Sequence, residues 1–440
     1  MSLEQRLKDH SAKIGIIGLG YVGLPLAVEY ADKGFQVLGI DTDGRKVSKI
    51  NFGENYISDV DDDTLRRVVK DGKFSATTTY DAVRELDAIY ICVPTPFNIN
   101  KDPDISYIIS SAEGVVPGLR KGQVIILKST TFPETTEKVV LPILESSGLK
   151  VGEDFYLAFS PERIDPGRTD FTTKNTPVVV GGVTEKCTDM ASQVITQVVS
   201  NVHVVSSPKV AEMEKLLENI FRSVNIALVN ELARLCDRMG GIDIWEVVEA
   251  AATKPFGFMP FYPGPGIGGH CILVDPYYMA WKAREYDFHT SFIELAAKVN
   301  EDMPFYVAGL IRKGLSNIGR AFKDANILML GVSFKENIDD TRNSPALSVL
   351  KLLLKRGAKN ISYNDPYVPE LRLNGMILKS EKLTQKLLQS QDVVVITAKH
   401  KEYDAEFIVN NSKVIVDTRN LTRNVKDPGK IIKLGEGEPF

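Results

Sequence analysis

The stretch that decides the fold is KIGIIGLGYVG, residues Lys13–Gly23. Its first five residues are typical of a short buried strand, and its last three glycines are spaced as G-x-G-x-x-G. Such glycines allow a tight turn and let a pyrophosphate reach the start of the next helix, which the pattern predicts over Leu24–Lys33. A second expected strand, Gln36–Ile40, ends at Asp41, whose carboxylate can accept hydrogen bonds from an adenosine ribose. The stretch therefore predicts a dinucleotide site, with NAD as the cofactor.

Two alternatives to this NAD site stay open on the residues alone. A tight turn between a strand and a helix can carry the same glycines with no ligand bound. Arg45 lies close enough to Asp41 in the sequence to leave NADP possible, since an arginine can accommodate a 2′-phosphate.

Farther along the chain, buried strands alternate with helices, which indicates a doubly wound parallel sheet. Long helical patterns follow, and a second α/β region opens, like the first, with a strand that runs into a glycine. The expected fold class is α/β, with two Rossmann-like parallel-sheet domains at residues 1–206 and 319–440 and a central helical spine at 207–318. Long helices of this kind commonly form a dimer surface, so a homodimer or higher homo-oligomer is expected. The further strands expected are Ala88–Val93, Gln123–Leu127, Val178–Val180, Asn326–Gly331, Asn360–Tyr363, Asp392–Ile396 and Lys413–Val416, and the further helices are Lys209–Met239, Ile244–Ala252, Thr290–Asn317 and Pro345–Arg356.

Composition narrows the class of protein. With 53 Lys and Arg against 57 Asp and Glu the net charge is −4, so a general nucleic-acid binder is not expected. The four cysteines lie far apart without a C-x-x-C pair, so neither a disulfide framework nor a zinc site is expected, and no other metal is. The polar start lacks the apolar core of a signal peptide, and no apolar run is long enough to span a bilayer. A cytoplasmic protein with no membrane partner is expected.

A second informative stretch is PGPGIGGHCILVD, residues Pro263–Asp275, which places Cys271 directly after a glycine-rich loop. Glycines let the backbone approach a ligand closely, and a thiolate attacks carbonyl carbon well. A nucleophilic cysteine together with a hydride acceptor suggests oxidation past an aldehyde, through a thioester, to an acid. A small buried apolar role for Cys271 stays open on the residues alone. His270 could lower the thiol pKa, but a structural role is the simpler interpretation.

Five motifs, in this order along the chain, resemble those of the UDP-sugar 6-dehydrogenases, the UDP-glucose/UDP-mannosaminuronate family: GLGYVGLP at 18–25, SPER at 160–163, GGHC at 268–271, FK at 334–335 and DTR at 340–342. The segments KPFGF at 254–258, WKAREY at 281–286 and FHT at 288–290 are most similar to bacterial and archaeal UDP-N-acetylglucosamine 6-dehydrogenases. Leu273 departs from the family pattern, which has proline there.

The resemblance implies a four-electron oxidation of a sugar C6 alcohol to a carboxylate with two NAD⁺ per turnover, acting on a UDP-N-acetylhexosamine or a UDP-hexose for surface polysaccharide. UDP-N-acetylglucosamine is the expected substrate, and UDP-glucose, UDP-N-acetylmannosamine and UDP-N-acetylgalactosamine are alternatives. A two-electron hydroxyacid dehydrogenase and a non-catalytic nucleotide-sugar-binding module are the competing classes of protein.

The resemblance also implies roles for individual residues. Cys271 would form a thiohemiacetal and then a thioester with C6, and Glu162 would activate water for thioester hydrolysis. Lys215 would stabilise negative charge on the C6 oxygen, and Asn219, on the same helix face, would bind the sugar or orient water. The remaining candidates, which would act through a water molecule in removing the C6 hydroxyl proton, are Asp275 and Thr130.

Ordinary alternatives accompany several of these roles. Glu162 could be a loop carboxylate, Lys215 part of a solvated charged stripe, Asp275 a turn starter before Pro276, and Thr130 the cap of a turn.

The binding residues expected from the resemblance form a substrate set and a cofactor set. Arg342 is assigned to the cofactor set, although it is also similar, like Lys335, to a contact to the substrate diphosphate. An aromatic run from Phe256 to Tyr262 could pack against the sugar or uracil, although core packing is the commoner fate of aromatic residues. The substrate set is Glu162, Lys215, Asn219, Tyr262, Gly268, Phe334, Lys335 and Arg419, and the cofactor set is Gly18, Gly20, Tyr21, Val22, Gly23, Asp41, Arg45, Thr95, Thr130 and Arg342.

Overall fold

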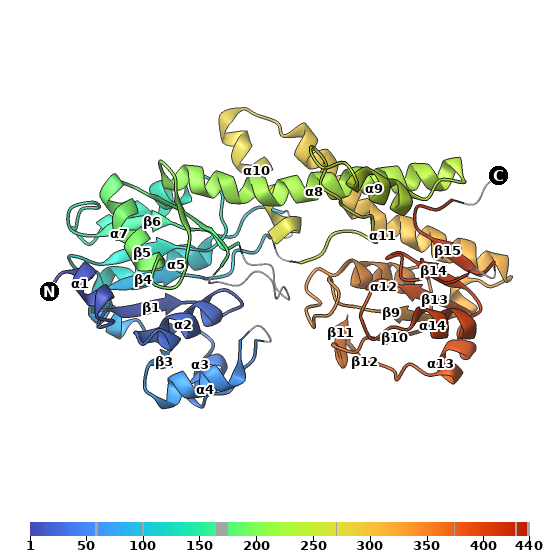
Figure 1. Ribbon diagram of the computed structural model, residues 1–440, viewed down its shortest axis with the longest axis horizontal. Helices are drawn as coiled ribbons and strands as arrows, with labels where there is room; N and C mark the ends of the chain where they lie inside the picture. The colour runs from blue at the N-terminus through green and yellow to red at the C-terminus, as the bar shows by residue number, and fades with distance from the viewer. Residues whose placement is uncertain are drawn as a thin grey trace. The chain divides into compact units, whose positions relative to one another are not determined.

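The computed structural model describes residues 1–57, 60–98, 101–163, 175–269, 271–373, 375–426 and 429–437, and of Cys271 the backbone alone. The chain separates into two compact units (Figure 1). The first unit comprises Met1–Glu218 and Tyr277–Phe288, and the second comprises Asn219–Pro276 and His289–Phe440.

The first unit contains an eight-stranded sheet in the order β3-β2-β1-β4-β5-β6-β7-β8. All neighbouring strands run parallel except β6 and β7, which are antiparallel, so the sheet is mixed rather than fully parallel as expected. Gly15 of β1 pairs with Leu38 of β2 on one side and with Ile89 of β4 on the other. The strands are β1 (Lys13–Ile17), β2 (Gln36–Ile40), β3 (Phe74–Thr77), β4 (Ala88–Ile91), β5 (Val124–Leu127), β6 (Tyr156–Phe159), β7 (Val178–Gly182) and β8 (Val202–Val204).

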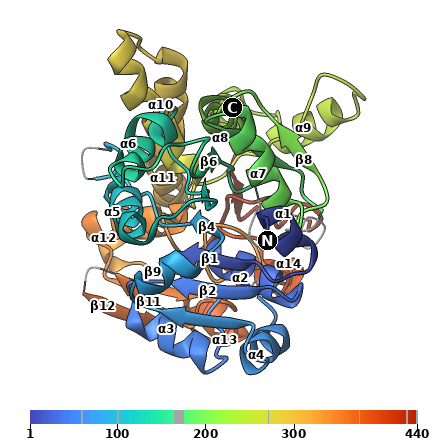
Figure 2. The same cartoon turned by 90° about the vertical axis from the view of Figure 1, so that its left-hand side faces the viewer.

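Both faces of this sheet are buried, because alternate side chains along each strand enter different cores. Tyr90 and Ile126 belong to one core, whereas Ile89 and Ile125 belong to the other. Figure 2 looks toward this unit. The helices that cover the sheet are α1 (Leu3–Lys8), α2 (Gly23–Asp32), α3 (Gly44–Asn51), α4 (Asp62–Lys70), α5 (Ser106–Val115), α6 (Leu141–Glu145) and α7 (Glu185–Ile195).

The middle of the chain is helical, as expected. Its longest element, α8 (Pro208–Met239), has 32 residues, and α9 (Ile244–Ala252) follows it. The other two helices are α10 (Cys271–Ala283) and α11 (Ser291–Asn317).

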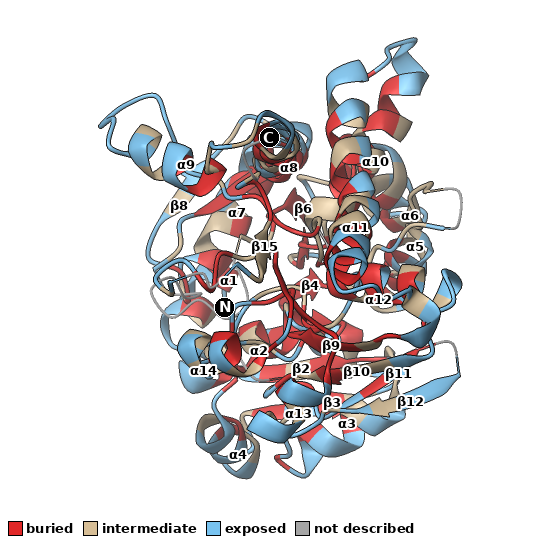
Figure 3. Cartoon of the chain, turned by 90° about the vertical axis from the view of Figure 1, so that its right-hand side faces the viewer, coloured by how far each residue is buried: buried red, intermediate tan, exposed pale blue. Residues whose placement is uncertain are grey.

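The second unit contains a five-stranded parallel sheet in the order β10-β9-β13-β14-β15. Its central strands are buried (Figure 3). The two Rossmann-like sheets confirm the expected fold class, but the sequence patterns did not predict the small hairpin of β11 (Glu370–Leu373) and β12 (Met376–Lys379). The remaining elements are β9 (Asn326–Leu330), α12 (Pro345–Lys355), β10 (Asn360–Asn364), α13 (Gln385–Ser390), β13 (Val393–Ile396), α14 (Ala405–Asn411), β14 (Ile415–Asp417) and β15 (Ile431–Lys433).

Each sheet has a point where the strand order reverses, between β1 and β4 in the first and between β9 and β13 in the second. Ligands of open α/β sheets bind beside the carboxyl ends of the strands at such points. The described cysteine side chains, Cys92, Cys187 and Cys236, are buried free thiols. Within the described ranges there is no helix with the length and apolarity of a membrane span, and no cluster of metal-ligating side chains.

Candidate active site

The glycine turn between β1 and α2 is tightly packed at its ends and open in its middle. Gly18 has a φ of 90°, its N–H donates to the Ile40 carbonyl over 2.7 Å, and a Cβ there would lie 2.6 Å from the Cys92 carbonyl oxygen. A Cβ at Gly23 would lie 1.8 Å from the Gly18 oxygen, whereas a Cβ at Gly20 would meet nothing within 4 Å. The outer glycines are therefore needed by the turn itself, and Gly20 leaves room for a ligand beside the backbone.

Asp41 stands at the end of β2, as the sequence predicted. One carboxylate oxygen accepts the Leu19 N–H over 2.9 Å and the Lys46 ammonium over 3.2 Å, and the other accepts the Asp43 N–H over 2.9 Å. The guanidinium of Arg45 is exposed and paired with Asp43. A turn open at Gly20 with a carboxylate at the adjacent strand end fits NAD.

The other expected cofactor contacts of this unit lie at the same edge of the sheet. Tyr21 is exposed at 37%, and Val22 directly precedes α2. Thr95 follows β4, and its carbonyl accepts the Tyr278 hydroxyl over 2.5 Å. Tyr278 is fully buried, so it holds the loop after β4 in place.

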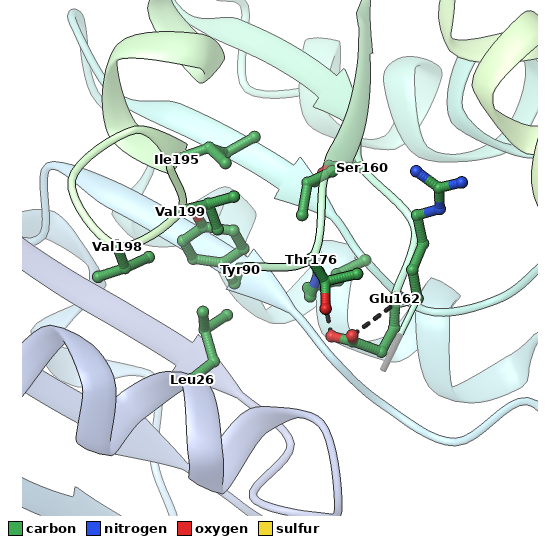
Figure 4. A pocket seen from close by; sticks show the side chains of 11 residues that line it. Leu26, Tyr90, Ser160, Glu162, Thr176, Ile195, Val198 and Val199 are labelled. Atoms are coloured by element: carbon green, nitrogen blue, oxygen red, sulfur yellow. Dashed lines mark hydrogen bonds and ion pairs between the residues drawn. The ribbon is translucent and has the colours of Figure 1, made fainter. Parts of the chain in front are cut away.

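Glu162 and Lys128 form a buried ion pair at the ends of the neighbouring strands β6 and β5. Their side chains lie 3.1 Å apart and are only 18% and 7% exposed. Both line a small cavity of about 20 Å³, and Figure 4 shows its apolar end formed around Tyr90. That volume holds about one water molecule. Sequence reasoning missed Lys128, although a lysine directly after an entirely apolar strand was a usable signal.

Lys215 and Asn219 are both buried on α8, which contradicts the alternative of a solvated charged stripe. Lys215 has no hydrogen-bond or ion-pair partner among the residues that the structure describes. One turn earlier on α8, Glu212 accepts the N–H groups of Glu134 and Thr136 over 2.6 and 2.9 Å. This fully buried carboxylate, whose pKa burial raises to about 7, joins α8 to the segment that follows Thr130. Thr130 itself is half-buried and makes no hydrogen bond to Glu162 or Lys215 within the described part of the chain.

In the second unit, Asn219 and Asp275 meet. The Asn219 amide donates to the Asp275 carboxylate over 2.5 Å, and the two side chains belong to α8 and α10. Asp275 is 1% exposed and lies one helical turn after Cys271, the first residue of α10. The alternative of a turn at Asp275 is wrong, because the helix continues through Pro276. The Cys271 side chain and His270 lie outside the described residues.

A chain of buried amides, which sequence reasoning missed, holds the glycine-rich loop before Cys271. The Gly264 N–H donates to Asn230 over 2.9 Å, Asn230 donates to Asn300 over 2.9 Å, and Asn300 donates to the Ser223 carbonyl over 3.0 Å. Asn230 and Asn300 are fully or almost fully buried. Two amides on otherwise apolar helix faces were the only sequence signal for this network.

The other side of the loop packs on the expected substrate residues. A Cβ at Gly268 would lie 2.5 Å from the Cβ of Phe334, and one at Gly264 would lie 2.4 Å from the Arg419 guanidinium. Gly269, with a φ of 87°, donates its N–H to the Arg342 carbonyl over 3.3 Å. The structure therefore gathers four of the predicted binding residues of this unit around one loop.

The basic side chains near this loop, Arg342, Arg419 and Lys335, differ in their surroundings. The Nε of Arg342 donates to Asp340 over 2.9 Å. The Nε of Arg419 donates to the Thr397 carbonyl over 3.1 Å, and burial lowers the pKa of Arg419 to about 10, which leaves it protonated at neutral pH. Lys335 follows Phe334 in the loop after β9 and is half-buried.

The aromatic side chains between Phe256 and Tyr262 differ in their exposure and in their ring contacts. Tyr262 stacks on Trp245 with ring centroids 5.6 Å apart and planes 15° apart, and it remains 42% exposed. Phe261 contacts Phe221 edge to face at 5.7 Å. Phe256 is 71% exposed.

Comparisons with known proteins match the chain over most of its length. Three domain models of the UDP-glucose/GDP-mannose dehydrogenase family match: the NAD-binding domain at residues 12–199, the central domain at 209–302 and the UDP-binding domain at 328–424. The UDP-N-acetyl-D-mannosamine dehydrogenase of Pyrococcus horikoshii is 35% identical over 94% of this chain and 96% of its own. The UDP-N-acetyl-D-glucosamine 6-dehydrogenase of Salmonella typhi is 36% identical over 89% of this chain and 90% of its own.

A solved structure of the UDP-D-ManNAc dehydrogenase from Pyrococcus horikoshii superposes with a TM-score of 0.87 at 33% identity, covering 97% of this chain and all of the other. These matches confirm the resemblance, the NAD cofactor and the enzymatic class expected from the sequence. The chain therefore belongs to the UDP-glucose/GDP-mannose dehydrogenase family and is an NAD-dependent UDP-sugar dehydrogenase.

Proposed function

We propose that this enzyme oxidises the C6 alcohol of UDP-N-acetylglucosamine to a carboxylate, for polysaccharide biosynthesis. The observation that carries the chemistry is the buried hydrogen bond between Asn219 and Asp275, one helical turn from Cys271. A carboxylate and an amide held dry and rigid beside a cysteine suit proton transfer and water orientation at one carbon atom.

In the first oxidation the substrate loses a proton and a hydride, and its C6 becomes an aldehyde carbon. The Gly18–Gly23 turn and Asp41 would hold NAD⁺, which would supply the hydride acceptor for both oxidations. Asp275, with Thr130, removes the hydroxyl proton through a water molecule. Lys215 stabilises the negative charge that develops on the C6 oxygen, since its ammonium has no other described partner.

In the second oxidation the Cys271 sulfur bonds to C6, and the aldehyde oxygen takes a proton to give a thiohemiacetal. Loss of the second hydride and of that proton leaves a thioester. Water then attacks C6, the thiolate leaves, and the product is the UDP-uronate. We assign activation of this water to Glu162, because it borders a cavity of one-water size and Lys128 keeps a positive charge beside it.

Substrate recognition is assigned to the loops of the second unit. Lys335, Arg342 and Arg419 offer positive charge for the diphosphate, and Phe334 and Gly268 form a packed wall beside it. We assign the contact to the sugar to Tyr262, because it stacks on Trp245 and is still exposed.

The identity of the sugar is tested by initial rates of NADH formation on UDP-glucose and on the UDP derivatives of N-acetylglucosamine, N-acetylmannosamine and N-acetylgalactosamine. We expect UDP-N-acetylglucosamine to be preferred and to yield two NADH per sugar. Preference for another of the four would replace the sugar but keep the mechanism. One NADH per sugar, or no NADH with any of them, would contradict the four-electron oxidation.

We also propose that the enzyme is a homodimer that associates through α8, and that the chain has three functional parts, at 1–206, 207–318 and 319–440. One face of α8 carries exposed apolar side chains spaced mostly three or four residues apart, as in a helix that packs against another helix. These residues are Met213, Leu217, Phe221, Leu228, Leu232, Leu235 and Met239. Light scattering on the purified enzyme should give twice the chain mass, and Leu228→Glu with Leu235→Glu should reduce it to one chain. A wild-type mass of a single chain would contradict the proposed dimer.

A further inference from the structure

In both sheets of this enzyme an aspartate follows the second strand and accepts a backbone N–H from the turn after the first strand. Asp41 follows β2 and accepts the Leu19 N–H, two residues past β1. Asp365 follows β10 and accepts the Val332 N–H over 2.7 Å, two residues past β9. In both sheets a carboxylate thus holds the first turn after the leading strand.

The Asp365 carboxylate is not accessible to a ligand, because it is buried and its oxygens accept hydrogen bonds from the protein. Besides Val332, Asp365 accepts the N–H of Ser333 over 3.2 Å and the Nε2 of His400 over 3.1 Å, all on one oxygen. The side chains of Asp365 and His400 are both completely buried. Burial alone would raise the pKa of Asp365, but the His400 hydrogen bond and the backbone N–H groups keep it below the usual value.

His400 reaches the far end of the same loop with its other ring nitrogen. Its Nδ1 accepts the Asn337 N–H over 2.9 Å, so Nδ1 carries no proton and Nε2–H donates to Asp365. Asn337 has a φ of 62°, and its side-chain oxygen accepts the Lys401 N–H over 2.9 Å. The imidazole therefore bridges the start of the loop, at Ser333, and its end, at Asn337.

Phe334 and Lys335 lie between these two anchored positions. The Ser333 hydroxyl donates to the Lys335 carbonyl over 2.7 Å, which closes a tight turn inside the loop. Since no regular element contains residues 331–344, side chains from neighbouring strand ends must set the direction in which Lys335 points.

We propose that His400 is a positioning residue for substrate binding: its Nδ1, by accepting the Asn337 N–H, fixes the loop 333–337 so that Phe334 and Lys335 face the substrate diphosphate. The inference rests on the proposed contact between Lys335 and the diphosphate. His400 does not touch the reacting atoms, so it acts on substrate affinity and not on the chemical steps.

A matched pair of substitutions separates the two ring nitrogens. His400→Asn keeps an oxygen near the place of Nδ1 and loses the contact to Asp365, whereas His400→Gln keeps a group near Nε2 and loses the acceptor for Asn337. For His400→Gln we expect the KM for the UDP-sugar and the Kd for UDP to rise roughly fivefold, the loss of about one hydrogen bond. His400→Asn should stay within about twofold of wild type, and both variants should keep kcat and the KM for NAD⁺.

The result that would overturn the proposal is an equal change of UDP affinity in both variants, or an unchanged affinity in His400→Gln. Hydrogen exchange of the backbone over residues 331–338 gives a readout that needs no activity, and it should be faster in His400→Gln than in His400→Asn. Asn337→Gly, which suits the positive φ of this exposed position and removes the side-chain contact to the Lys401 N–H, should weaken UDP binding by a smaller factor and keeps the test available if the His400 variants do not fold.

Lys335→Ala separates this inference from the proposed function. If Lys335→Ala leaves the Kd for UDP unchanged while His400→Gln speeds exchange in the loop, the assignment of Lys335 fails and the anchoring by His400 stands. If Lys335→Ala weakens UDP binding and His400→Gln does not, the positioning role of His400 fails.

Discussion

The loops that follow β1 and β9 begin alike and then differ in length. In both, a glycine with positive φ follows the strand and donates its N–H to the end of the next parallel strand, Gly18 to Ile40 and Gly331 to Asn364. After β1 five residues, 18–22, lead into α2, whereas after β9 fourteen residues, 331–344, precede α12. The short glycine turn is held by its own backbone and by Asp41, whereas the long loop that carries cations is held by Asp365 and, at its far end, by His400 as well.

The largest expected effect concerns the two strand-end carboxylates. Asp365→Ala leaves four backbone N–H groups and a buried imidazole without their acceptor, so we expect a loss of about 3–5 kcal/mol in the free energy of unfolding of the second unit. Asp41→Ala should cost about 1–2 kcal/mol and act mainly on the Kd for NAD⁺. Urea unfolding of both variants and NAD⁺ titration measure these quantities. Equal losses of stability in Asp41→Ala and Asp365→Ala would contradict the expected difference between the two carboxylates.

A second prediction concerns the strand-end ion pair of Lys128 and Glu162, to which we assign a role in thioester hydrolysis. Lys128→Met should lower kcat roughly 100-fold, because Glu162 would lose the neighbouring charge that favours its ionised form. In single-turnover experiments the first NADH should form at the wild-type rate, and hydrolysis of the thioester should be slower than in wild type. Lys413→Met, which removes an exposed partner of Asp392 in the other sheet, is the matched control and should leave kcat unchanged.

The two strand-end glycines provide a third test. A Cβ at Gly18 would lie 2.6 Å from a backbone oxygen, and one at Gly331 would lie 2.5 Å from the Ala398 Cβ. Each alanine substitution should cost about 2 kcal/mol of stability through the positive φ and the close contact. Gly18→Ala should weaken NAD⁺ binding alone and Gly331→Ala UDP binding alone, as titration of each variant with both ligands would show. Crossed effects would mean that the two turns do not serve separate ligands.

The smallest expected effect is the acid sensitivity of Asp365. Its pKa in the folded protein lies below the usual value, despite burial, because His400 and backbone N–H groups favour the carboxylate. Its contribution to stability is therefore complete above the unfolded pKa, about 4, and is lost as the pH falls through the folded value. Melting temperatures measured from pH 6 to pH 3 should fall more steeply for wild type than for Asp365→Asn. Parallel curves would contradict the assignment.

Local patterns were enough to predict most of the fold. The helices α8, α9, α11 and α12 and the strand β10 lie within about one residue of their predicted bounds, because apolar periodicity reflects the burial of one face. The strand β7 was predicted, at Val178–Val180, but its antiparallel direction was not, since its pairing with β6 depends on a neighbour that a strand pattern does not reveal. In the hairpin β11–β12, the first strand alternates polar and apolar residues over only four positions, and the second, Met376–Lys379, is apolar without alternation and mostly exposed.

Where a motif is contiguous in sequence, as at Gly18–Gly23, the local structure was predicted, whereas the roles of Asp275 and the other site residues stay predictions. Residues that act through partners far along the chain were missed. Lys128 pairs with Glu162, Asn230 with Asn300, and His400 with Asp365, and a single sequence does not report which side chains meet. The identity of the sugar depends on the dimensions of its pocket, which composition and spacing do not reveal.

The buried thiols described above make this enzyme a good subject for active-site titration. Burial raises the pKa of Cys92 to about 12 and also raises that of Cys236, and Cys187 is completely buried. Alkylating reagents attack thiolates, so these three thiols should stay unmodified while the fold is intact. One alkyl group per chain, found by mass spectrometry at Cys271, the proposed nucleophile, would then count the molecules in a preparation whose proposed nucleophile is reactive.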